Sequence, residues 1–179
     1  RMRRASFDGL KRLEVFQWSF NPQIPKAKII DLATCHFVPR KENVMFTGPA
    51  GVGKSHIAQA IGERACRMGH SVLCTSAHRM LSELRAARAD QTYDKKMLRL
   101  TSPDVLVIDD LGLRPLELDE PIDLYEIIRQ RYEVGSMIIT SNRALEEWYP
   151  LFLDDLMASA AMDRLLHHSH VVVMEGDSF

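Results

Sequence analysis

The sequence of 179 residues has few cysteines and no long apolar run. Its three cysteines, Cys35, Cys66 and Cys74, are an odd number without a CxxC pair, which is typical of a reducing cytosol. No apolar stretch approaches the roughly 20 residues that span a bilayer, and no signal peptide is recognisable. These absences favour a cytoplasmic protein without a membrane partner.

The sequence also lacks an excess of either charge, since 23 Lys and Arg oppose 24 Asp and Glu for a net charge of −1. This balance argues against nucleic-acid binding driven by overall charge, although a local basic patch is compatible with it. Residues 1–13 are such a patch, with five basic residues and one acidic residue. A solvated linker explains them slightly better than a nucleic-acid contact.

A glycine-rich segment, GPAGVGKS at 48–55, follows a short apolar run and precedes a helical pattern. It matches the phosphate-binding loop (P-loop), in which glycines let backbone amides surround a phosphate at a helix N-terminus. Lys54 can reach the β- and γ-phosphates of a nucleotide, and the Ser55 hydroxyl can ligate Mg²⁺. The alternative is a flexible turn, but the match covers eight residues and both flanks. The predicted nucleotide-binding residues are Gly48, Pro49, Ala50, Gly51, Val52, Gly53, Lys54, Ser55 and His56.

Five apolar or β-branched runs alternate with helical patterns, which predicts an α/β fold with a five-stranded parallel sheet flanked by helices. The predicted strands are 43–47, 71–75, 104–108, 136–141 and 170–174. Helices are expected from Lys54 to about Gly69, after the N-cap Asp119, and over 154–166; residues 76–102 are long enough for two more. The helix after Asp119 is expected to bury one face, made of Ile122, Tyr125, Ile128 and Tyr132.

Paired carboxylates, Asp109 and Asp110, follow the third apolar run. The carboxyl edge of a parallel sheet is where ligands bind in open α/β folds. Asp109 is suited to hold Mg²⁺ through water opposite Ser55, and Asp110 to orient or deprotonate an attacking water. The alternative is two solvated aspartates that open a loop.

Two later polar residues suit roles at a phosphate but have plainer explanations. Asn142 can hydrogen-bond a γ-phosphate or the attacking water, or it can belong to a polar turn. Arg164 lies late in a helix, where it can pair with a neighbouring subunit's phosphate as an arginine finger. The alternative is a cation at a helix C-terminus that interacts with the helix dipole, and residue chemistry alone favours this alternative.

The P-loop, VIDD, TSN and DRL, in this order and at these separations, resemble the core of AAA+ ATPases. Residues 42–62, 105–112, 129–148 and 162–179 resemble, more narrowly, the IstB family of transposition helper ATPases, close relatives of the helicase loader DnaC. The resemblance implies an ATPase that assembles on DNA and shares nucleotide between neighbours. It also implies roles at matching positions: the P-loop residues Lys54 and Ser55, the metal and catalytic carboxylates Asp109 and Asp110, sensor 1 at Asn142, and the finger at Arg164.

Two departures from the wider AAA+ pattern affect these expectations. Asp110 stands where many AAA+ proteins have Glu, which favours slow hydrolysis. The sequence leaves no room for a helical lid after the last strand. We therefore expect a basic N-terminal segment and adenine-side approach at 1–42, followed by a lidless AAA+ core at 43–179, in a fragment of a longer chain.

The resemblance also suggests where the base and the DNA bind. Residues 13–24 precede the P-loop where AAA+ chains pass over adenine, with Phe20 and Asn21 as candidates; core packing explains Phe20 equally well. The charged segment 78–99 corresponds to a helix that lines the DNA path in initiator-type relatives, and a solvated helical face is its alternative. Its candidate DNA contacts are Arg85, Arg88, Lys95, Lys96 and Arg99. The HHSH run at 167–170 lacks a matching ligand set, so a zinc site is disfavoured.

Two functions are therefore expected from the sequence. The first is an ATP- and Mg²⁺-dependent DNA-binding protein that forms a ring or spiral on DNA, hydrolyses ATP slowly with DNA stimulation, and assists a transposase. The second is a DnaC-like loader of a replicative helicase, or an ATP-gated DNA scaffold. The neighbouring genes would distinguish the two.

Overall fold

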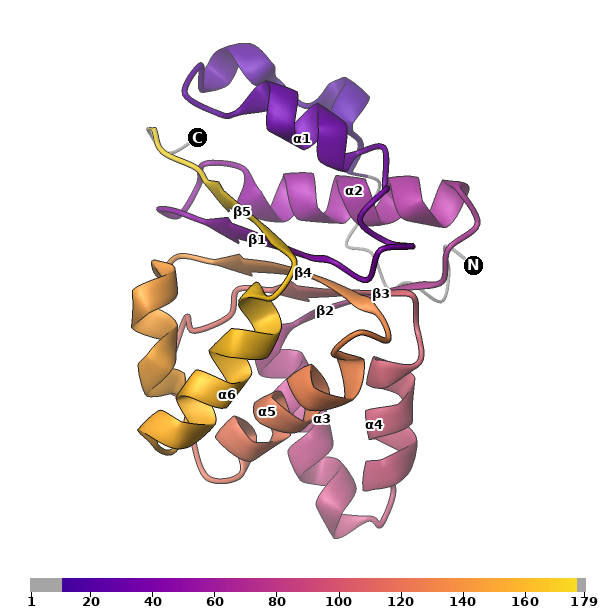
Figure 1. Cartoon of the computed structure of the whole chain (residues 1–179), viewed down its shortest axis with the longest axis vertical. Coiled ribbons are helices and arrows are strands. Elements are labelled where there is room, and N and C mark those ends of the chain that lie inside the picture. Colours follow the sequence, from indigo (N-terminus) through magenta and orange to yellow (C-terminus); the bar gives the residue numbers. More distant parts are fainter. Residues whose placement is uncertain (1–10, 177–179) are drawn as a thin grey trace.

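Five parallel strands form the centre of the structure, a computed structural model that describes residues 11–176 (Figure 1). The strands are β1 (Asn43–Thr47), β2 (Val72–Ser76), β3 (Val105–Asp109), β4 (Ser136–Ser141) and β5 (Ser169–Val173). Their order across the sheet is β2-β3-β4-β1-β5. The predicted α/β class is confirmed, and each predicted strand lies within one residue of an observed one.

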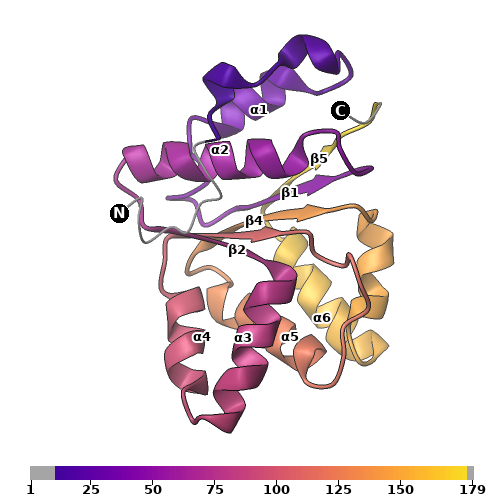
Figure 2. The ribbon, with the colours of Figure 1, turned by 180° about the vertical axis from the view of Figure 1, so that it is seen from behind.

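Helices cover both faces of the sheet, as Figures 1 and 2 show from opposite sides. One face carries α1 (Lys26–Leu32) and α2 (Lys54–Arg67). The other face carries α3 (Ala77–Ala89), α4 (Tyr93–Thr101), α5 (Glu120–Arg131) and α6 (Asp155–Leu166). Three short 3-10 segments complete the described elements: η2 (Leu13–Val15), η3 (Trp18–Phe20) and η4 (Leu145–Leu151).

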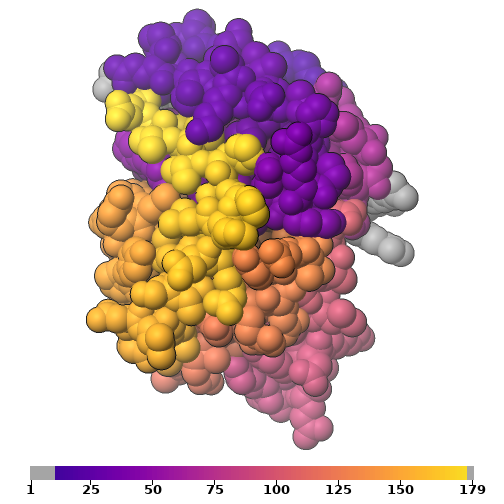
Figure 3. All heavy atoms as spheres, viewed as in Figure 1, coloured from indigo at the N-terminus to yellow at the C-terminus, as the bar shows by residue number. Residues whose placement is uncertain are grey.

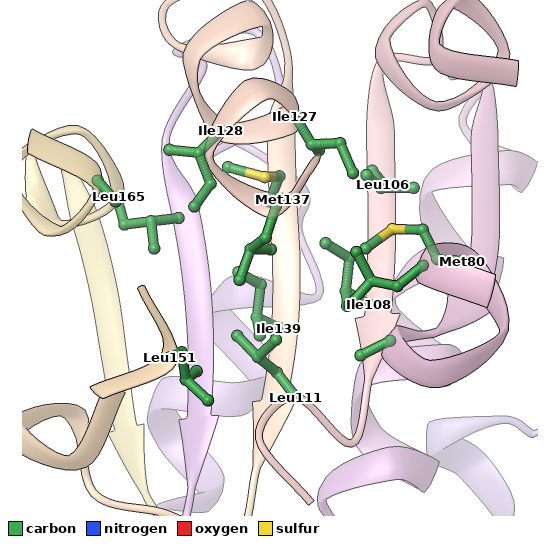
Figure 4. Packing of buried hydrophobic residues seen from close by; sticks show 14 of the residues in the cluster. Met80, Leu106, Ile108, Leu111, Ile127, Ile128, Met137, Ile139, Leu151 and Leu165 are labelled. Carbon is green, nitrogen blue, oxygen red and sulfur yellow. The ribbon is translucent and has the colours of Figure 1, made fainter. Parts of the chain in front are cut away.

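The central strands are buried on both faces because helices cover both, whereas the edge strand β5 is mostly half-buried. Every residue of β1 and β4 is buried. Val44 and Phe46 pack toward α2, whereas Met45 joins the opposite cluster with Ile139. Figure 4 shows this second cluster, in which residues of α3, α5 and α6 cover the strands. A parallel sheet covered in this way reads as continuous apolar runs, which made its strands recognisable.

Residues 11–42 pack against the α2 side of the same sheet. Ile24, Ile29 and Leu32 share one apolar cluster with Val44 and Ile57. The N-terminal part of the chain also lies beside the C-terminal strand on the surface (Figure 3). Within the described residues, no helix is long and apolar enough to cross a membrane.

Helix α5 buries a different face from the predicted one. Ile122 is 40% exposed, and Tyr125 and Tyr132 are only half-buried. The helix instead buries Glu120, Pro121, Asp123, Leu124, Ile127, Ile128 and Arg131. Ile128 is buried as expected. The expectation failed for the other three residues because three of the side chains buried instead are charged, held by hydrogen bonds and ion pairs that an apolar pattern does not detect.

Arg131, at the end of α5, is fully buried and organises the amino edge of the sheet. Its guanidinium nitrogens donate to five carbonyls, those of Leu100, Thr101, Pro103, Asp104 and Ser136, at 2.8–3.4 Å. Burial lowers the pKa of Arg131 to about 10, against the opposing effect of Asp104. The side chain thereby joins the end of α4 to the starts of β3 and β4.

Replacing this arginine should destabilise the fold. Arg131→Met keeps the length of the side chain but leaves the buried carbonyls without their donor, so we expect a loss of about 3 kcal/mol in the free energy of unfolding. Urea denaturation followed by circular dichroism measures it. Arg129→Met is the matched control, because Arg129 is exposed and its ion pair among residues 11–176 is with Glu126 of its own helix. Equal midpoints for the two variants would contradict the role of Arg131.

Candidate nucleotide site

The predicted P-loop connects the end of β1 to the start of α2 in a conformation that requires glycine. Gly48, Gly51 and Gly53 all have positive φ angles, of 140°, 80° and 98°. A Cβ on Gly48 would lie 1.9 Å from the carbonyl oxygen of Met174, so no side chain fits there. Gly53 is the N-cap of α2 and brings no capping side chain. The loop thus leads into a helix N-terminus of the kind that binds anions.

Lys54 points back across this loop. It exposes 4% of its surface, and its Nζ donates to the carbonyl oxygen of Pro49 at 2.5 Å. Burial lowers its pKa, while the negative charges of Asp110 and Asp109 act in the opposite direction. The predicted lysine and the predicted carboxylates therefore lie in one electrostatic site.

The side chain of Asp109 and the backbone of Asp110 are held by a residue that sequence reasoning missed, Thr140. This buried side chain of β4 donates its hydroxyl to Asp109, and the same oxygen accepts the backbone N–H of Asp110 at 2.9 Å. Asp110 has a left-handed backbone with φ of 57°. Its pKa is raised by burial and by Asp109, and Lys54 opposes the shift. The small polar end of the IITSN segment was the only signal for Thr140.

The loop after Asp110 is fixed by charged side chains that sequence reasoning also missed. Arg114 donates to both oxygens of the buried Glu120 at 2.9 Å, and it contacts His78 at the start of α3. Asp110 and Arg114 line a largely apolar cavity of about 380 Å³ with Leu81. The candidate catalytic carboxylate thus begins a loop tied to both α3 and α5.

The donor set suits Mg²⁺ bound together with a nucleotide. Ser55 lies in the first turn of α2, beside Lys54, and Asp109 ends β3. A hydroxyl and a carboxylate are the hard oxygen ligands that Mg²⁺ prefers, with phosphate oxygens and water completing its shell. No group of three or more His, Cys, Asp or Glu within residues 11–176 could hold a metal ion on its own. This also gives the HHSH run no ligand set there.

Asn142 lies beside the start of the P-loop. It is exposed just after β4, which neighbours β1 in the sheet. It lines a pocket of about 530 Å³ together with Gly48, Pro49 and residues of β5. The structure thus places the candidate sensor next to the loop, as its position after a strand suggested.

A pocket of about 340 Å³ lies on the other side of the P-loop. It is lined by Gly51, Val52, Gly53 and His56 from the loop and α2, and by Val15, Phe16, Gln17 and Phe20 from the N-terminal segment. Phe16 was not predicted; its ring lies 5.2 Å from that of His56. Asn21 is not among the lining residues. Its side-chain amide donates to the carbonyl of Glu175 at 2.5 Å, so it holds the C-terminal segment.

Arg164 lies far from the P-loop of its own chain. The next residue, Leu165, accepts a hydrogen bond at its carbonyl from the side chain of Asn43, the first residue of β1, at 3.1 Å. The P-loop follows the last residue of that strand, Thr47. The guanidinium donates to the carbonyl of Ala160 at 2.8 Å. Arg164 and the P-loop are therefore at opposite edges of one sheet.

The five candidate DNA contacts divide into two groups. Arg85 and Arg88 form ion pairs with the buried carboxylates of Glu120 and Asp123 on α5, at 3.0 and 2.5 Å. The other three belong to α4, where Lys95 and Arg99 are exposed and Lys96 lies 3.7 Å from Glu83. The α4 group has the more accessible charge.

The whole chain, residues 1–179, matches the family described as IstB-like ATP binding protein. An ATP-binding protein of insertion sequence IS21 from Pseudomonas aeruginosa is 36% identical over 179 residues, which cover 100% of this chain and 68% of the relative. An insertion-sequence ATP-binding protein of Mycobacterium tuberculosis is 38% identical over 180 residues, covering 100% of this chain and 72% of that protein. The chain thus spans about two thirds of the length of these relatives.

Solved structures share the fold at lower identity. Replication initiator DnaA from Aquifex aeolicus, bound to AMPPCP, has a TM-score of 0.76 at 20% identity, covering 93% of this chain and 50% of DnaA. The DnaC helicase loader has a TM-score of 0.71 at 21% identity, covering 83% of this chain and 87% of the loader. Since the family match runs along its entire length, the chain belongs to the IstB-like ATP-binding protein family.

Proposed function

We propose that the chain binds ATP with Mg²⁺ and hydrolyses it, in an assembly on DNA that assists the transposition of an insertion sequence. One observation carries the proposal: Lys54 of the P-loop shares an electrostatic site with Asp109 and Asp110. The relatives at 36% and 38% identity are named as insertion-sequence ATP-binding proteins, which supports the transposition context.

Each residue of the site has a chemical task in this proposal. The P-loop amides and the Lys54 ammonium bind the phosphates. Mg²⁺, held by Ser55 and Asp109, supplies charge neutralisation when bound. Asp110 orients the attacking water and accepts its proton, and its raised pKa makes it a stronger base than an ordinary aspartate. Asn142 hydrogen-bonds the γ-phosphate or the water.

The base of ATP is proposed to occupy the pocket of about 340 Å³ beside the P-loop. Aromatic and aliphatic side chains suit the faces of a purine ring. Phe20 lines this pocket, and Phe16 and His56 add further ring surface. Asn21 contributes indirectly, because it fixes the segment that carries Phe20.

DNA is proposed to contact the exposed cations of α4, Lys95 and Arg99, together with Lys96. Arg85 and Arg88 are half-exposed, and the buried carboxylates hold their guanidinium groups in fixed orientations. Phosphate contacts of this kind supply sequence-independent affinity that falls as salt rises. A helicase-loading function is not favoured, because DnaC and DnaI share the fold at 21–22% identity, whereas the relatives above 30% belong to insertion sequences.

Lys54→Ala should abolish ATP binding or turnover. The lysine charge opposes the β- and γ-phosphates, and alanine leaves those charges uncompensated in a partly dry loop. Isothermal titration calorimetry with Mg-ATP and a phosphate-release assay measure both quantities, with circular dichroism to verify folding. An affinity and rate equal to those of the wild-type chain would rule out the site.

Asp110→Asn should retain ATP binding and lose about 100-fold or more in hydrolysis rate, since the amide is no base. Asparagine is the suitable replacement because it tolerates the left-handed backbone at this position, where alanine would add strain. Binding and steady-state rate are measured on the same preparation. An unaltered rate would place catalysis elsewhere.

Arg164→Ala should retain ATP binding and lose DNA-stimulated hydrolysis, because Arg164 serves the neighbouring subunit. Mixing this variant with Lys54→Ala should restore part of the activity, since one chain supplies the arginine and the other the intact loop. The matched control replaces Lys54→Ala by the Lys54→Ala/Arg164→Ala double variant, which supplies neither group. Equal rates in the two mixtures would exclude a shared site.

A further inference from the structure

The guanidinium of Arg164 lies beside two tyrosine rings, that of Tyr125 in α5 and that of Tyr132, the C-cap of the same helix. Its central carbon is 5.8 Å from the ring centre of Tyr125 and 6.0 Å from that of Tyr132. One nitrogen donates to the carbonyl of Ala160, one turn earlier in α6. The side chain of Arg164 is therefore half-buried, lies along its own helix and contacts both aromatic rings.

Both tyrosines contact Arg164 from the α5 side, Tyr125 from within the helix and Tyr132 from its C-cap. They are seven residues apart, which is two helical turns, and α5 packs against α6. Both rings are half-buried, which is why the buried apolar face of α5 does not include them.

Tyr132 is itself held in place. Its hydroxyl is hydrogen-bonded to Nδ1 of His167 at 2.9 Å, and the two rings are 5.7 Å apart. His167 is the C-cap of α6, and its ring contacts that of His168 in a tilted arrangement with ring centres 4.0 Å apart. This contact joins the end of α5 to the end of α6, close to Arg164.

Aromatic contacts hold a guanidinium without cancelling its charge. Within residues 11–176, no carboxylate lies within ion-pair distance of Arg164, whereas Arg85, Arg88 and Arg129 each pair with an acidic side chain. An ion pair offsets part of an arginine's positive charge, so a paired arginine attracts a phosphate less strongly. A ring attracts the cation through its quadrupole and leaves the positive charge available.

We propose that Tyr125 and Tyr132 are positioning residues for Arg164, and that they hold its uncompensated guanidinium ready for the phosphates of a nucleotide bound to a second copy of this chain. The inference rests on the proposed shared site and adds to it the residues that prepare the arginine. Tyr132 acts through its ring, and the hydroxyl bond to His167 fixes that ring.

The mixture of Lys54→Ala and Arg164→Ala chains tests the positioning role, because each chain contributes only one of the two groups that form a shared site. The Lys54→Ala chain supplies the arginine, and the Arg164→Ala chain supplies the nucleotide loop. Tyr132→Leu is introduced into either chain, and phosphate release is measured with Mg-ATP and DNA. In the arginine-supplying chain it should lower the restored rate about three- to thirty-fold, as expected for loss of a cation–π contact. In the loop-supplying chain the rate should change by less than about twofold.

Two further variants separate positioning from folding. Tyr132→Phe keeps the ring and removes the hydroxyl, so it should lose less activity than Tyr132→Leu in the same chain. Tyr125→Leu keeps the bond between Tyr132 and His167, and it repeats the test if Tyr132→Leu unfolds. Equal losses in both chains, or no loss in either, would overturn the positioning role. Absence of any rescue in the parent mixture would overturn the shared site itself, and this inference with it.

Discussion

The hydroxyl of Thr140 is a single small group between two strands, and the candidate site depends on it. It donates to Asp109 and accepts from the backbone of Asp110, so β4 fixes the carboxylate of Asp109 and the backbone that carries Asp110. The bond requires the parallel register of β3 and β4, in which Ile108 lies opposite Ile139. A slip of one residue would turn the hydroxyl to the other face of the sheet. The apolar core that fixes this register therefore also fixes the geometry of the site.

Short sequence patterns predicted the P-loop and the strands, because the backbone conformation and burial of these segments determine which residues they contain. The glycines of the P-loop and the five apolar runs needed no distant partner to be recognised, because positive φ angles and two-sided burial each leave a mark in the sequence. Asp109, Asn142 and the P-loop converge because the carboxyl ends of parallel strands share one edge. Their positions directly after predicted strands were sufficient to assign these residues to the same edge of the sheet.

Contacts between distant residues could not be predicted in this way. Asn21 has a side-chain amide that could hydrogen-bond a nucleotide base, yet the amide donates to the carbonyl of Glu175, 154 residues away. Arg85 and Arg88 have the pattern of a solvated basic face, and their partners are carboxylates on another helix. Side-chain type alone does not indicate which of several charged groups will be its neighbour. The apolar pattern predicted the wrong face of α5 because it could not show that charged residues of this helix have buried partners.

The position of Arg164 constrains how copies of this chain can combine. A C2 dimer places the same patch of each subunit against itself, so it could bring Arg164 to a P-loop only if both lay on one surface. Arg164 and the P-loop lie at opposite edges of the sheet, because the P-loop follows the end of β1 and Arg164 adjoins its beginning. A contact that joins them is heterologous and repeats from subunit to subunit. If Arg164 serves a second copy as proposed, the copies would form a ring or spiral and not a closed pair, and in an open spiral one terminal loop would lack its arginine.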